Sequence, residues 1–316
     1  MKILIIGTGS IGIAIACSMI SQNVDVSLFS REATANVIKD EGIAFKRKDN
    51  VIKCMPNQFR LFTKYDNLPR NYFDYVFISS KTTGNDEISK NLGENKDILN
   101  ENGKIIIFQN GFGNDEPYLR YFKADEVYCA RVITGLKRSE RNTAESTLDS
   151  TSILIGSLQD ASVNSLKELT VYFENAGFES DITTTISKDL WAKMLYNCAL
   201  NPLGAILNVK TGQLIENEYS KSIVDTIIDE VFDVMDAYGY STFWENSAEY
   251  KQVFYTELVP DTYNHISSTS QDILNKNKSE IDSFSGKIVE LARKKNISVP
   301  TNEMIYKLIK SIESEF

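Results

Sequence analysis

The sequence predicts an α/β protein in which a Rossmann-type doubly wound parallel sheet is followed by an all-α C-terminal domain. In the first part of the chain, short runs rich in β-branched residues alternate with helical patterns, which is the arrangement of parallel βαβ units. From about Lys188 the strand-like runs stop, and helical patterns continue almost to the end. We therefore expect two domains, residues 1–184 and residues 185–316.

The individual elements follow from the same patterns. Between the first two expected strands, SIGIAIACSMISQ is predicted to form an amphipathic helix. The expected strands are KILIIG, VDVSLFS, DYVFISS, GKIIIFQN and EVYCARVI, with a last strand pair near TLDSTSILIG. The expected helices of the second domain are residues 188–208, 217–238, 246–256, 269–295 and 301–314, and the Ser267-Ser268 pair can cap the fourth.

Composition excludes several classes of function. The net charge of the 316-residue chain is −9, so nucleic acid and anionic membranes would repel most of its surface. No run is long and apolar enough to cross a membrane, and the first apolar stretch lacks the cleavage-site pattern of a signal peptide. Four scattered cysteines without a CxxC pair and a single histidine argue against a metal site and for the reduced thiols of a cytoplasmic protein.

A glycine motif, GTGSIG, follows the first expected strand and precedes the first expected helix. In that context the first glycine permits the tight turn, the second lets the backbone approach a pyrophosphate, and the third lets the helix pack on the strand. A turn that merely packs a helix on a strand is the structural alternative. The predicted dinucleotide-binding turn consists of Gly7, Thr8, Gly9, Ser10, Ile11 and Gly12.

The end of the second expected strand bears on the choice of cofactor. VDVSLFSRE places Ser30 and Arg31 where an NAD-binding protein carries an acidic residue for the ribose. A guanidinium at this place suits the extra phosphate of NADP, although Glu32 follows immediately and weakens the interpretation. We predict NADP(H) as the cofactor and Arg31 as a phosphate ligand.

A polar stripe runs along the expected helix 188–208. Lys193, Asn197 and Asn201 are spaced four residues apart, so they lie on one face of an otherwise apolar helix. A carbonyl that receives a hydride needs a proton donor, and an ammonium facing a cleft can bind and protonate its oxygen while neutral amides hold the substrate. A solvated helix face, or a polar network buried between domains, would produce the same pattern.

Four motifs then make the chain resemble the ketopantoate reductase family from Gly7 to about Ser314. They read LWAKMLYNCALNPLGAILN, SSTSQDILNKNKSEIDSFSG, NISVPTN and QNGFGN. The resemblance implies NADPH-dependent reduction of the small 2-oxo acid 2-dehydropantoate to pantoate, in pantothenate and coenzyme A biosynthesis. The chain departs from the family pattern at Gly204 and Thr269, where the family usually has Thr and Met, and at Thr134 and Gly135, which align only loosely.

The resemblance also implies roles for individual residues. It makes Lys193 the catalytic acid and Glu280 a second catalytic residue, near the nicotinamide ribose and the substrate hydroxyl. Simpler explanations exist for others: Ser268 as a helix cap, Asn110 as part of a turn, Glu280 as the partner of a surface lysine, and Lys81 as an exposed strand end. The implied substrate contacts are Asn110, Asn197, Asn201 and Ser268, and the implied cofactor contacts are the glycine turn, Arg31, Lys81, Asn110 and Glu280.

Two alternatives to this function stay open at the level of sequence. One is a reductase of a different 2-oxo acid that uses the same acid in a different pocket. The other is a sensor that binds NADP without turnover, although such a protein would have no need of a proton donor at Lys193. The sequence leaves the oligomeric state open between monomer and homodimer.

Overall fold

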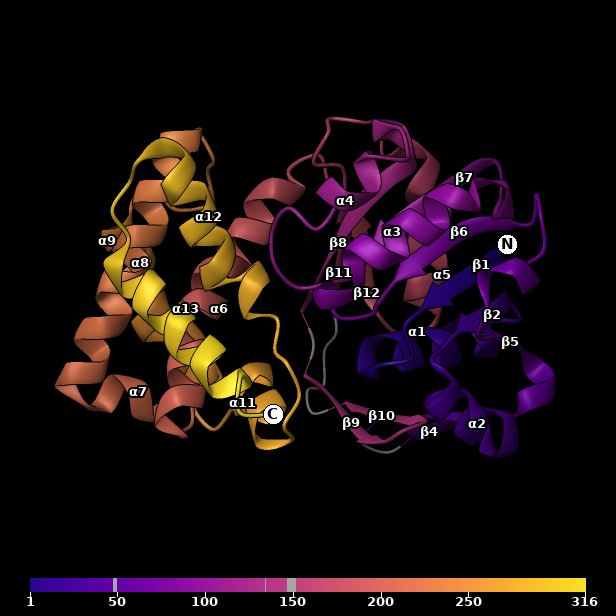
Figure 1. Cartoon of the computed structure of the whole chain (residues 1–316), viewed down its shortest axis with the longest axis horizontal. Helices are drawn as coiled ribbons and strands as arrows, with labels where there is room; N and C mark the ends of the chain where they lie inside the picture. Colours follow the sequence, from indigo (N-terminus) through magenta and orange to yellow (C-terminus); the bar gives the residue numbers. More distant parts are fainter. Residues whose placement is uncertain (48–49, 134, 147–151) are drawn as a thin grey trace. The chain divides into compact units, whose positions relative to one another are not determined.

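The computed structural model describes residues 1–47, 50–133, 135–146 and 152–316, and these divide into two compact units (Figure 1). The first unit comprises Met1–Asn110 and Asn114–Ile186. The second comprises Gly111–Gly113 and Ser187–Phe316. The first unit is a mixture of strands and helices, whereas the second is built from helices.

An eight-stranded sheet forms the centre of the first unit, in the order β12-β11-β8-β7-β6-β1-β2-β5. Adjacent strands from β5 to β8 are parallel, which confirms the predicted doubly wound class. At the other edge β11 is antiparallel to β8, so the sheet is not parallel throughout. The strands are β1 (Lys2–Ile6), β2 (Asp25–Phe29), β5 (Arg60–Phe62), β6 (Phe73–Ile78), β7 (Leu99–Ile107), β8 (Val127–Ile133), β11 (Ser152–Gly156) and β12 (Glu179–Ile182).

Helices of the first unit connect these strands, and the central strand β1 is fully covered. Ile3, Leu4 and Ile5 are completely buried, as expected for an interior strand with both faces packed. The α-helices are α1 (Ser10–Ser21), α2 (Glu32–Glu41), α3 (Asn85–Glu94), α4 (Glu116–Leu119) and α5 (Lys167–Asn175). Short 3₁₀ turns are η1 (Pro56–Gln58), η2 (Tyr65–Asn67), η3 (Thr82–Gly84), η4 (Lys96–Ile98), η5 (Ala124–Glu126) and η6 (Asn164–Leu166).

A second sheet that the sequence did not predict covers α1. Its strands lie in the order β4-β3-β10-β9, with β3 at Ile43–Arg47, β4 at Asn50–Cys54, β9 at Leu136–Glu140 and β10 at Thr143–Ser146. The two hairpins are distant in the chain. Their many charged residues interrupt the β-branched pattern by which strands are predicted. Thr134, and residues 147–151 of the expected strand pair, lie outside the described residues.

This second sheet explains why α1 is not amphipathic as predicted. Every residue from Gly12 to Ile20 is buried. The helix packs against β2 on the main sheet and against β3, β4 and β10 of the second sheet. With sheet on more than one side, the helix has no solvent-facing stripe, and apolar residues are stable around its circumference.

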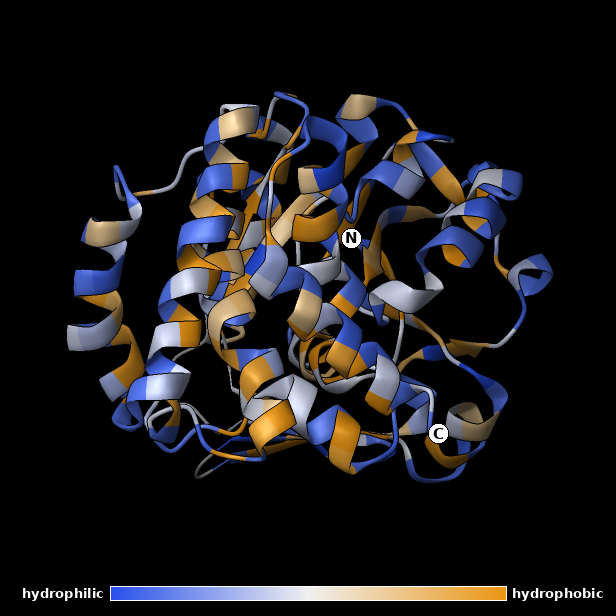
Figure 2. Cartoon of the chain, turned by 60° about the vertical axis from the view of Figure 1, so that its left-hand side comes forward, coloured by the Kyte–Doolittle hydropathy of each residue, from blue (hydrophilic) through white to orange (hydrophobic). Residues whose placement is uncertain are grey.

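The second unit confirms the predicted all-α domain, since residues 187–316 are all described and contain no strand. Figure 2 shows hydrophobic and hydrophilic residues alternating along helices, the pattern of helices with one buried face. No helix in the described part of the chain is long and apolar enough to span a membrane. The helices are α6 (Ile186–Leu207), α7 (Gln213–Glu216), α8 (Glu218–Tyr238), α9 (Ser247–Val253), the π-helix η7 (Phe254–Leu258), α10 (Val259–Asp261), α11 (Ser268–Leu274), the 3₁₀ turn η8 (Ile281–Ser283), α12 (Ser285–Lys295) and α13 (Pro300–Glu313).

The expectation of one continuous helix over residues 269–295 is wrong. The helix ends with α11 at Leu274 and resumes with α12 at Ser285. Lys276 has a φ of +53°, in the left-handed region that an α-helix cannot contain. The polar sequence NKNKS at this point offers no apolar residue to bury, so nothing stabilises a helix there.

Candidate functional site

The turn between β1 and α1 contains two glycines that the packing of the chain itself requires. Gly7 has a φ of +105°, and a Cβ added there would lie 2.4 Å from the backbone nitrogen of Ser80. A Cβ added to Gly12 would lie 2.0 Å from the carbonyl oxygen of Gly7. Neither position can accept a side chain unless the turn moves.

Gly9 has a different environment. It is the N-cap of α1, and the nearest atom to a Cβ added there would be the carbonyl oxygen of Ser79 at 3.8 Å. No side chain caps the helix, and its first turn carries no acidic residue. The first N–H groups of α1, at Ser10 and Ile11, lack partners within the helix, so the turn suits an anion such as a pyrophosphate.

The end of β2 is joined to the glycine turn by a hydrogen bond between two buried hydroxyl groups. The Oγ1 atom of Thr8 lies 2.7 Å from the Oγ atom of Ser30. The next residue, Arg31, is the exposed N-cap of α2, and Glu32 follows in the first helical turn. Ser30 is therefore engaged within the protein, and Arg31 is the side chain at this strand end that is accessible to a ligand.

The carboxyl ends of β6 and β7 are fixed by a buried amide pair that sequence reasoning missed. Gln109 donates a 2.7 Å hydrogen bond to Oδ1 of Asn85, and Asn85 donates one of 3.0 Å to Oε1 of Gln109. Gln109 also donates to the carbonyl oxygen of Ser80 at 2.9 Å. Lys81, which is exposed, and Asn110, which is half-buried, follow directly on these fixed residues. The sequence signal for Gln109 is its position directly before Asn110 in the QNGFGN motif.

In the second unit, the polar stripe of α6 is largely enclosed. Asn197 and Asn201 are 7% and 6% exposed, and Nδ2 of Asn201 donates a 3.2 Å hydrogen bond to Oδ1 of Asn197. Lys193, one turn earlier, is half-buried. A solvated helix face is therefore excluded for the two asparagines. Their mutual bond leaves Nδ2 of Asn197 as a donor and Oδ1 of Asn201 as an acceptor for other groups.

Other titratable groups around the stripe are poor proton donors at neutral pH. Burial raises the pKa of the Cys198 thiol and of the Tyr196 hydroxyl, which donates a 2.6 Å hydrogen bond to Oγ1 of Thr262. Burial also lowers the pKa of His265, so its imidazole is neutral at pH 7. Lys193 is the lysine of the stripe, one turn before Asn197.

The N-terminus of α11 is attached to the stripe by Ser267. Its hydroxyl donates to the carbonyl oxygen of Asn201 at 3.1 Å and accepts from the backbone N–H of Ser270 at 3.1 Å. Ser267, rather than Ser268, is thus the helix cap. Ser268 is exposed beside it. The family motif points to Ser268, and the sequence carries no signal for the hydrogen bond from Ser267 to the Asn201 carbonyl.

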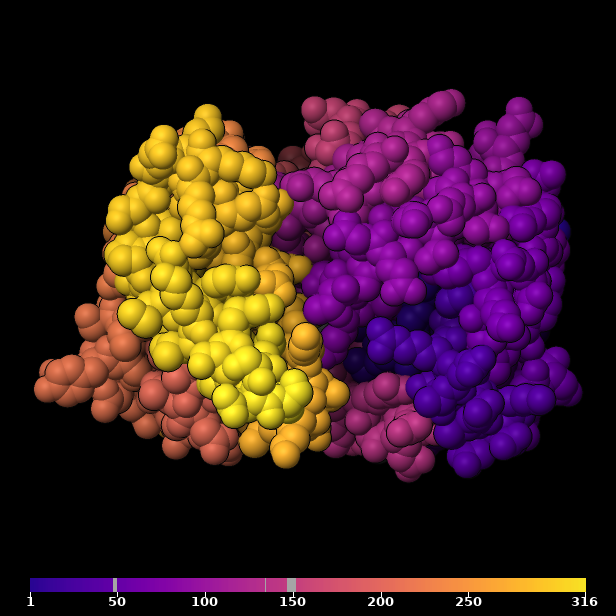
Figure 3. Space-filling model, in the orientation of Figure 1, coloured from indigo at the N-terminus to yellow at the C-terminus, as the bar shows by residue number. Residues whose placement is uncertain are grey.

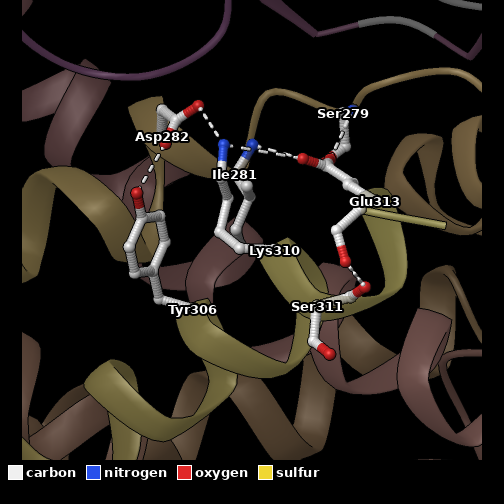
Figure 4. Close-up of polar contacts among 8 residues, drawn as sticks. Ser279, Ile281, Asp282, Tyr306, Lys310, Ser311 and Glu313 are labelled. Carbon is white, nitrogen blue, oxygen red and sulfur yellow. Dashed lines mark hydrogen bonds and ion pairs between the residues drawn. The ribbon is translucent and has the colours of Figure 1, made fainter. Parts of the chain in front are cut away.

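The segment that carries Glu280 is held on both sides by α13 (Figure 4). Preceding Glu280, Ser279 donates hydrogen bonds from its backbone N–H and its hydroxyl to Oε1 of the buried Glu313, at 2.7 and 2.6 Å. Following it, Asp282 accepts from the Tyr306 hydroxyl at 2.8 Å and from the Lys310 ammonium at 3.1 Å. A segment with little regular structure is in this way given a fixed position, and we call these contacts the α13 clamp.

The start of α13 is fixed in turn by a carboxylate from α8. Glu230 is 5% exposed, and its two oxygens accept 2.8 Å hydrogen bonds from the backbone N–H groups of Thr301 and Asn302. The side-chain amide of Asn302 donates to the same carboxylate at 2.8 Å. A negative charge at a helix N-terminus is favourable, so the VPTN motif has a structural explanation as the receiving end of this cap. Figure 3 shows residues of α13, in yellow, at the surface of the second unit.

Apart from Glu280, which lies in the segment held by α13, the predicted residues form two groups, each described within its own unit. One comprises the glycine turn, Arg31, Lys81 and Asn110, at the carboxyl ends of adjacent strands β2, β1, β6 and β7. The other comprises the α6 stripe, with Ser268 beside it through Ser267. The first group defines a dinucleotide-binding fold of the Rossmann type, because ligands of such sheets bind at the carboxyl ends of the strands.

Comparison with known proteins identifies the family. Residues 3–160 match the model described as ketopantoate reductase PanE/ApbA, and residues 185–313 match the model of its C-terminal part. The chain is 35% identical over 314 residues to the 2-dehydropantoate 2-reductase of Aquifex aeolicus, covering 99% of this chain and 97% of that protein. The chain belongs to the ketopantoate reductase PanE/ApbA family.

More distant relatives and solved structures agree with this fold. The 2-dehydropantoate 2-reductase of Pyrococcus horikoshii is 27% identical over 318 residues, covering 99% of this chain and 98% of that protein. A PanE/ApbA family ketopantoate reductase from Ralstonia eutropha superposes with a TM-score of 0.87 at 22% identity, covering 100% and 99% of the two chains. D-mandelate dehydrogenase bound to NADH and anilino(oxo)acetate also has a TM-score of 0.87, at 18% identity and the same coverage, so it has the same fold.

Proposed function

We propose that this protein is an oxidoreductase that reduces 2-dehydropantoate to pantoate with NADPH, in pantothenate and coenzyme A biosynthesis. Family membership and the similarity to the Aquifex aeolicus reductase over nearly the whole chain support it. The structural observation that carries the proposal is the α6 stripe. Two buried amides on one apolar helix are costly unless they meet polar groups, and their mutual hydrogen bond leaves Nδ2 of Asn197 and Oδ1 of Asn201 for a 2-oxo acid.

In this proposal residues 1–184 bind the cofactor. Room beside Gly9 and the uncapped N-terminus of α1 fit a pyrophosphate, and Arg31 suits the 2′-phosphate that distinguishes NADP from NAD. Lys81 and Asn110, at the ends of neighbouring strands, contribute further contacts to the dinucleotide. When bound, the nicotinamide supplies the hydride.

Residues 185–316 then hold the substrate and handle the proton. The ammonium of Lys193 donates a hydrogen bond to the 2-oxo oxygen and protonates it as negative charge develops there. Asn197 and Asn201 hold the polar groups of the substrate, oriented by the hydrogen bond between their amides. The Ser268 hydroxyl donates to the substrate carboxylate, and the carboxylate of Glu280 accepts from hydroxyl groups of the substrate and the nicotinamide ribose.

A specific observation favours a second candidate, the reduction of a different 2-oxo acid. Thr269 is 1% exposed, and its hydroxyl oxygen has no hydrogen-bond partner among the described residues. Gly204 lies nearby, since a Cβ added there would be 3.9 Å from Oγ of Ser270. Both are positions where the chain departs from the family pattern, and they alter the size and polarity of the region next to Ser268.

A panel of 2-oxo acids tests the proposal. Oxidation of NADPH by the purified protein is measured with 2-dehydropantoate, with smaller and branched aliphatic 2-oxo acids, and with aromatic ones. We expect the highest kcat/KM with 2-dehydropantoate. A value at least about tenfold higher with another acid would establish the second candidate, since a single methylene can be worth that much. No oxidation with any acid, together with tight NADPH binding, would favour the sensor.

We further propose the cytoplasm as the location of the protein. All four cysteines are buried and free, as is usual where glutathione keeps thiols reduced. Fusion to a fluorescent protein in the source cell, with fractionation as the second measurement, tests this assignment.

A further inference from the structure

The β9–β10 hairpin brings positive charge to α2. This hairpin, part of the unpredicted second sheet, carries Lys137, Arg138 and Arg141 in a chain whose net charge is −9. Lys137 forms a 2.9 Å ion pair with Glu145 on the neighbouring strand. The structure gives neither arginine an ion pair with a carboxylate in the described part of the chain, so their charges are available for another anion.

Both arginines reach the first turn of α2. Nη2 of Arg138 donates to Oγ1 of Thr34 at 3.4 Å and also to the carbonyl oxygen of Arg141. Nη1 of Arg141 donates to the carbonyl oxygen of Ala33 at 3.3 Å. Ala33 and Thr34 lie two and three residues after Arg31, the N-cap of the same helix. Three guanidinium groups therefore belong to one short region at the end of β2.

The electrostatics of this region fit a dianion. Burial, and to a smaller extent the like charge of the neighbouring Arg141, lower the pKa of Arg138. The N-terminus of α2 has no side-chain cap, and its dipole adds further positive potential. Glu32 in the same helical turn and Glu140 on the hairpin are both exposed and supply two opposing charges, fewer than the three guanidinium groups.

We propose that Arg138 and Arg141 join Arg31 in binding the 2′-phosphate of NADPH, and so determine the preference for NADPH over NADH. The inference rests on the proposed function for the identity of the cofactor. Guanidinium groups bind phosphate through paired N–H donors. Hydrogen bonds of Arg138 and Arg141 to backbone carbonyl oxygens hold these two side chains in place before a ligand binds. The second sheet then has a part in cofactor choice besides covering α1.

Binding of two small probes separates charge recognition from general stability. Adenosine 2′,5′-bisphosphate carries the 2′-phosphate and adenosine 5′-monophosphate lacks it, and both are titrated calorimetrically into the full-length protein. We expect Arg138→Gln and Arg141→Gln each to weaken binding of the bisphosphate by about tenfold, because a charge-assisted contact is lost. The affinity for the monophosphate should stay unchanged. Lys137→Gln, on the same hairpin, is the matched control and should change neither affinity.

The remaining outcomes are equally decisive. Glutamine keeps a hydrogen-bond donor for the contacts with α2, so an equal loss of both probes, or a fall in Tm without a change in selectivity, means that the arginines only fasten the hairpin, and the inference fails. If the unmodified protein prefers the bisphosphate, and Arg31→Ala abolishes that preference while both glutamine variants keep it, the inference fails and the proposed cofactor stands. If the unmodified protein has no preference, both fail.

Discussion

The glycine turn offers backbone groups to a ligand, whereas the α6 stripe offers side chains. At the turn, space and backbone N–H groups make the site, and side chains are excluded: Gly7 and Gly12 have no room for one, and Gly9 leaves room for a ligand. On α6 the site consists of side chains, and their positions depend on hydrogen bonds between buried groups, such as that between Asn201 and Asn197.

The difference teaches what each site is sensitive to. An added atom disturbs a backbone-built site, because the ligand must approach the chain closely. A removed donor or charge disturbs a site built from side chains, because its buried partner is left unsatisfied. The following substitutions test this contrast, starting from the largest expected effect.

Lys193→Ala should have the largest effect on turnover. If the ammonium donates the proton, kcat with the best 2-oxo acid falls by at least ~100-fold, the lower end of what positioned general acids contribute. The NADPH dissociation constant, measured by fluorescence, should stay nearly unchanged, since the proposed function assigns cofactor binding to the glycine turn. Lys188→Ala, on the same helix, is the control with normal turnover. If Lys193→Ala keeps nearly full activity, Lys193 is not the general acid.

Gly9→Ala and Gly12→Ala should separate binding from folding at the glycine turn. Gly9→Ala adds a methyl group that fits within the protein, so Tm should change little. The same methyl group would occupy space that a bound pyrophosphate needs, so NADPH affinity should fall by about tenfold. Gly12→Ala forces a Cβ against the Gly7 carbonyl and should lower Tm. If Gly9→Ala binds NADPH normally, the turn does not contact the dinucleotide as proposed.

Asn201→Ala should act on substrate binding more than on chemistry. If the amide contacts the substrate in the ground and transition states alike, its loss should raise KM by roughly tenfold and lower kcat less. Steady-state kinetics with 2-dehydropantoate measure both constants. A fall in kcat with KM unchanged would instead make Asn201 a group that acts in the transition state.

Glu313→Gln tests whether the α13 clamp matters to the site. The amide can still accept from Ser279 but loses the charge, so we expect a stability loss of about 1 kcal/mol in urea unfolding. A fall of about fivefold in kcat, with KM nearly constant, should accompany it, because Glu280 is less firmly held. Glu315→Gln, an exposed acid two residues later, is the control. Unchanged kcat in a destabilised variant would make the clamp purely structural.

Much of the fold was predictable because its signals are local. The strand, glycine motif and helix of β1 and α1 lie within some twenty residues, and the three residues of the α6 stripe share one helix. The bounds of α6, α8 and α13 agree closely with those expected, since apolar spacing alone marks a long helix with a buried face. The residue types of the stripe likewise stood out against an apolar background.

What the tertiary structure decided involves partners that are distant in the chain. The second sheet pairs β3 with β10, and the cover it provides is what buries α1 on several sides and brings Arg138 and Arg141 to α2. Whether a carboxylate such as Glu230 or Glu313 is buried depends on donors that reach it from another helix, and the sequence around it carries no trace of them. Local pattern sets which element forms, whereas long-range packing sets which of its side chains can meet a ligand.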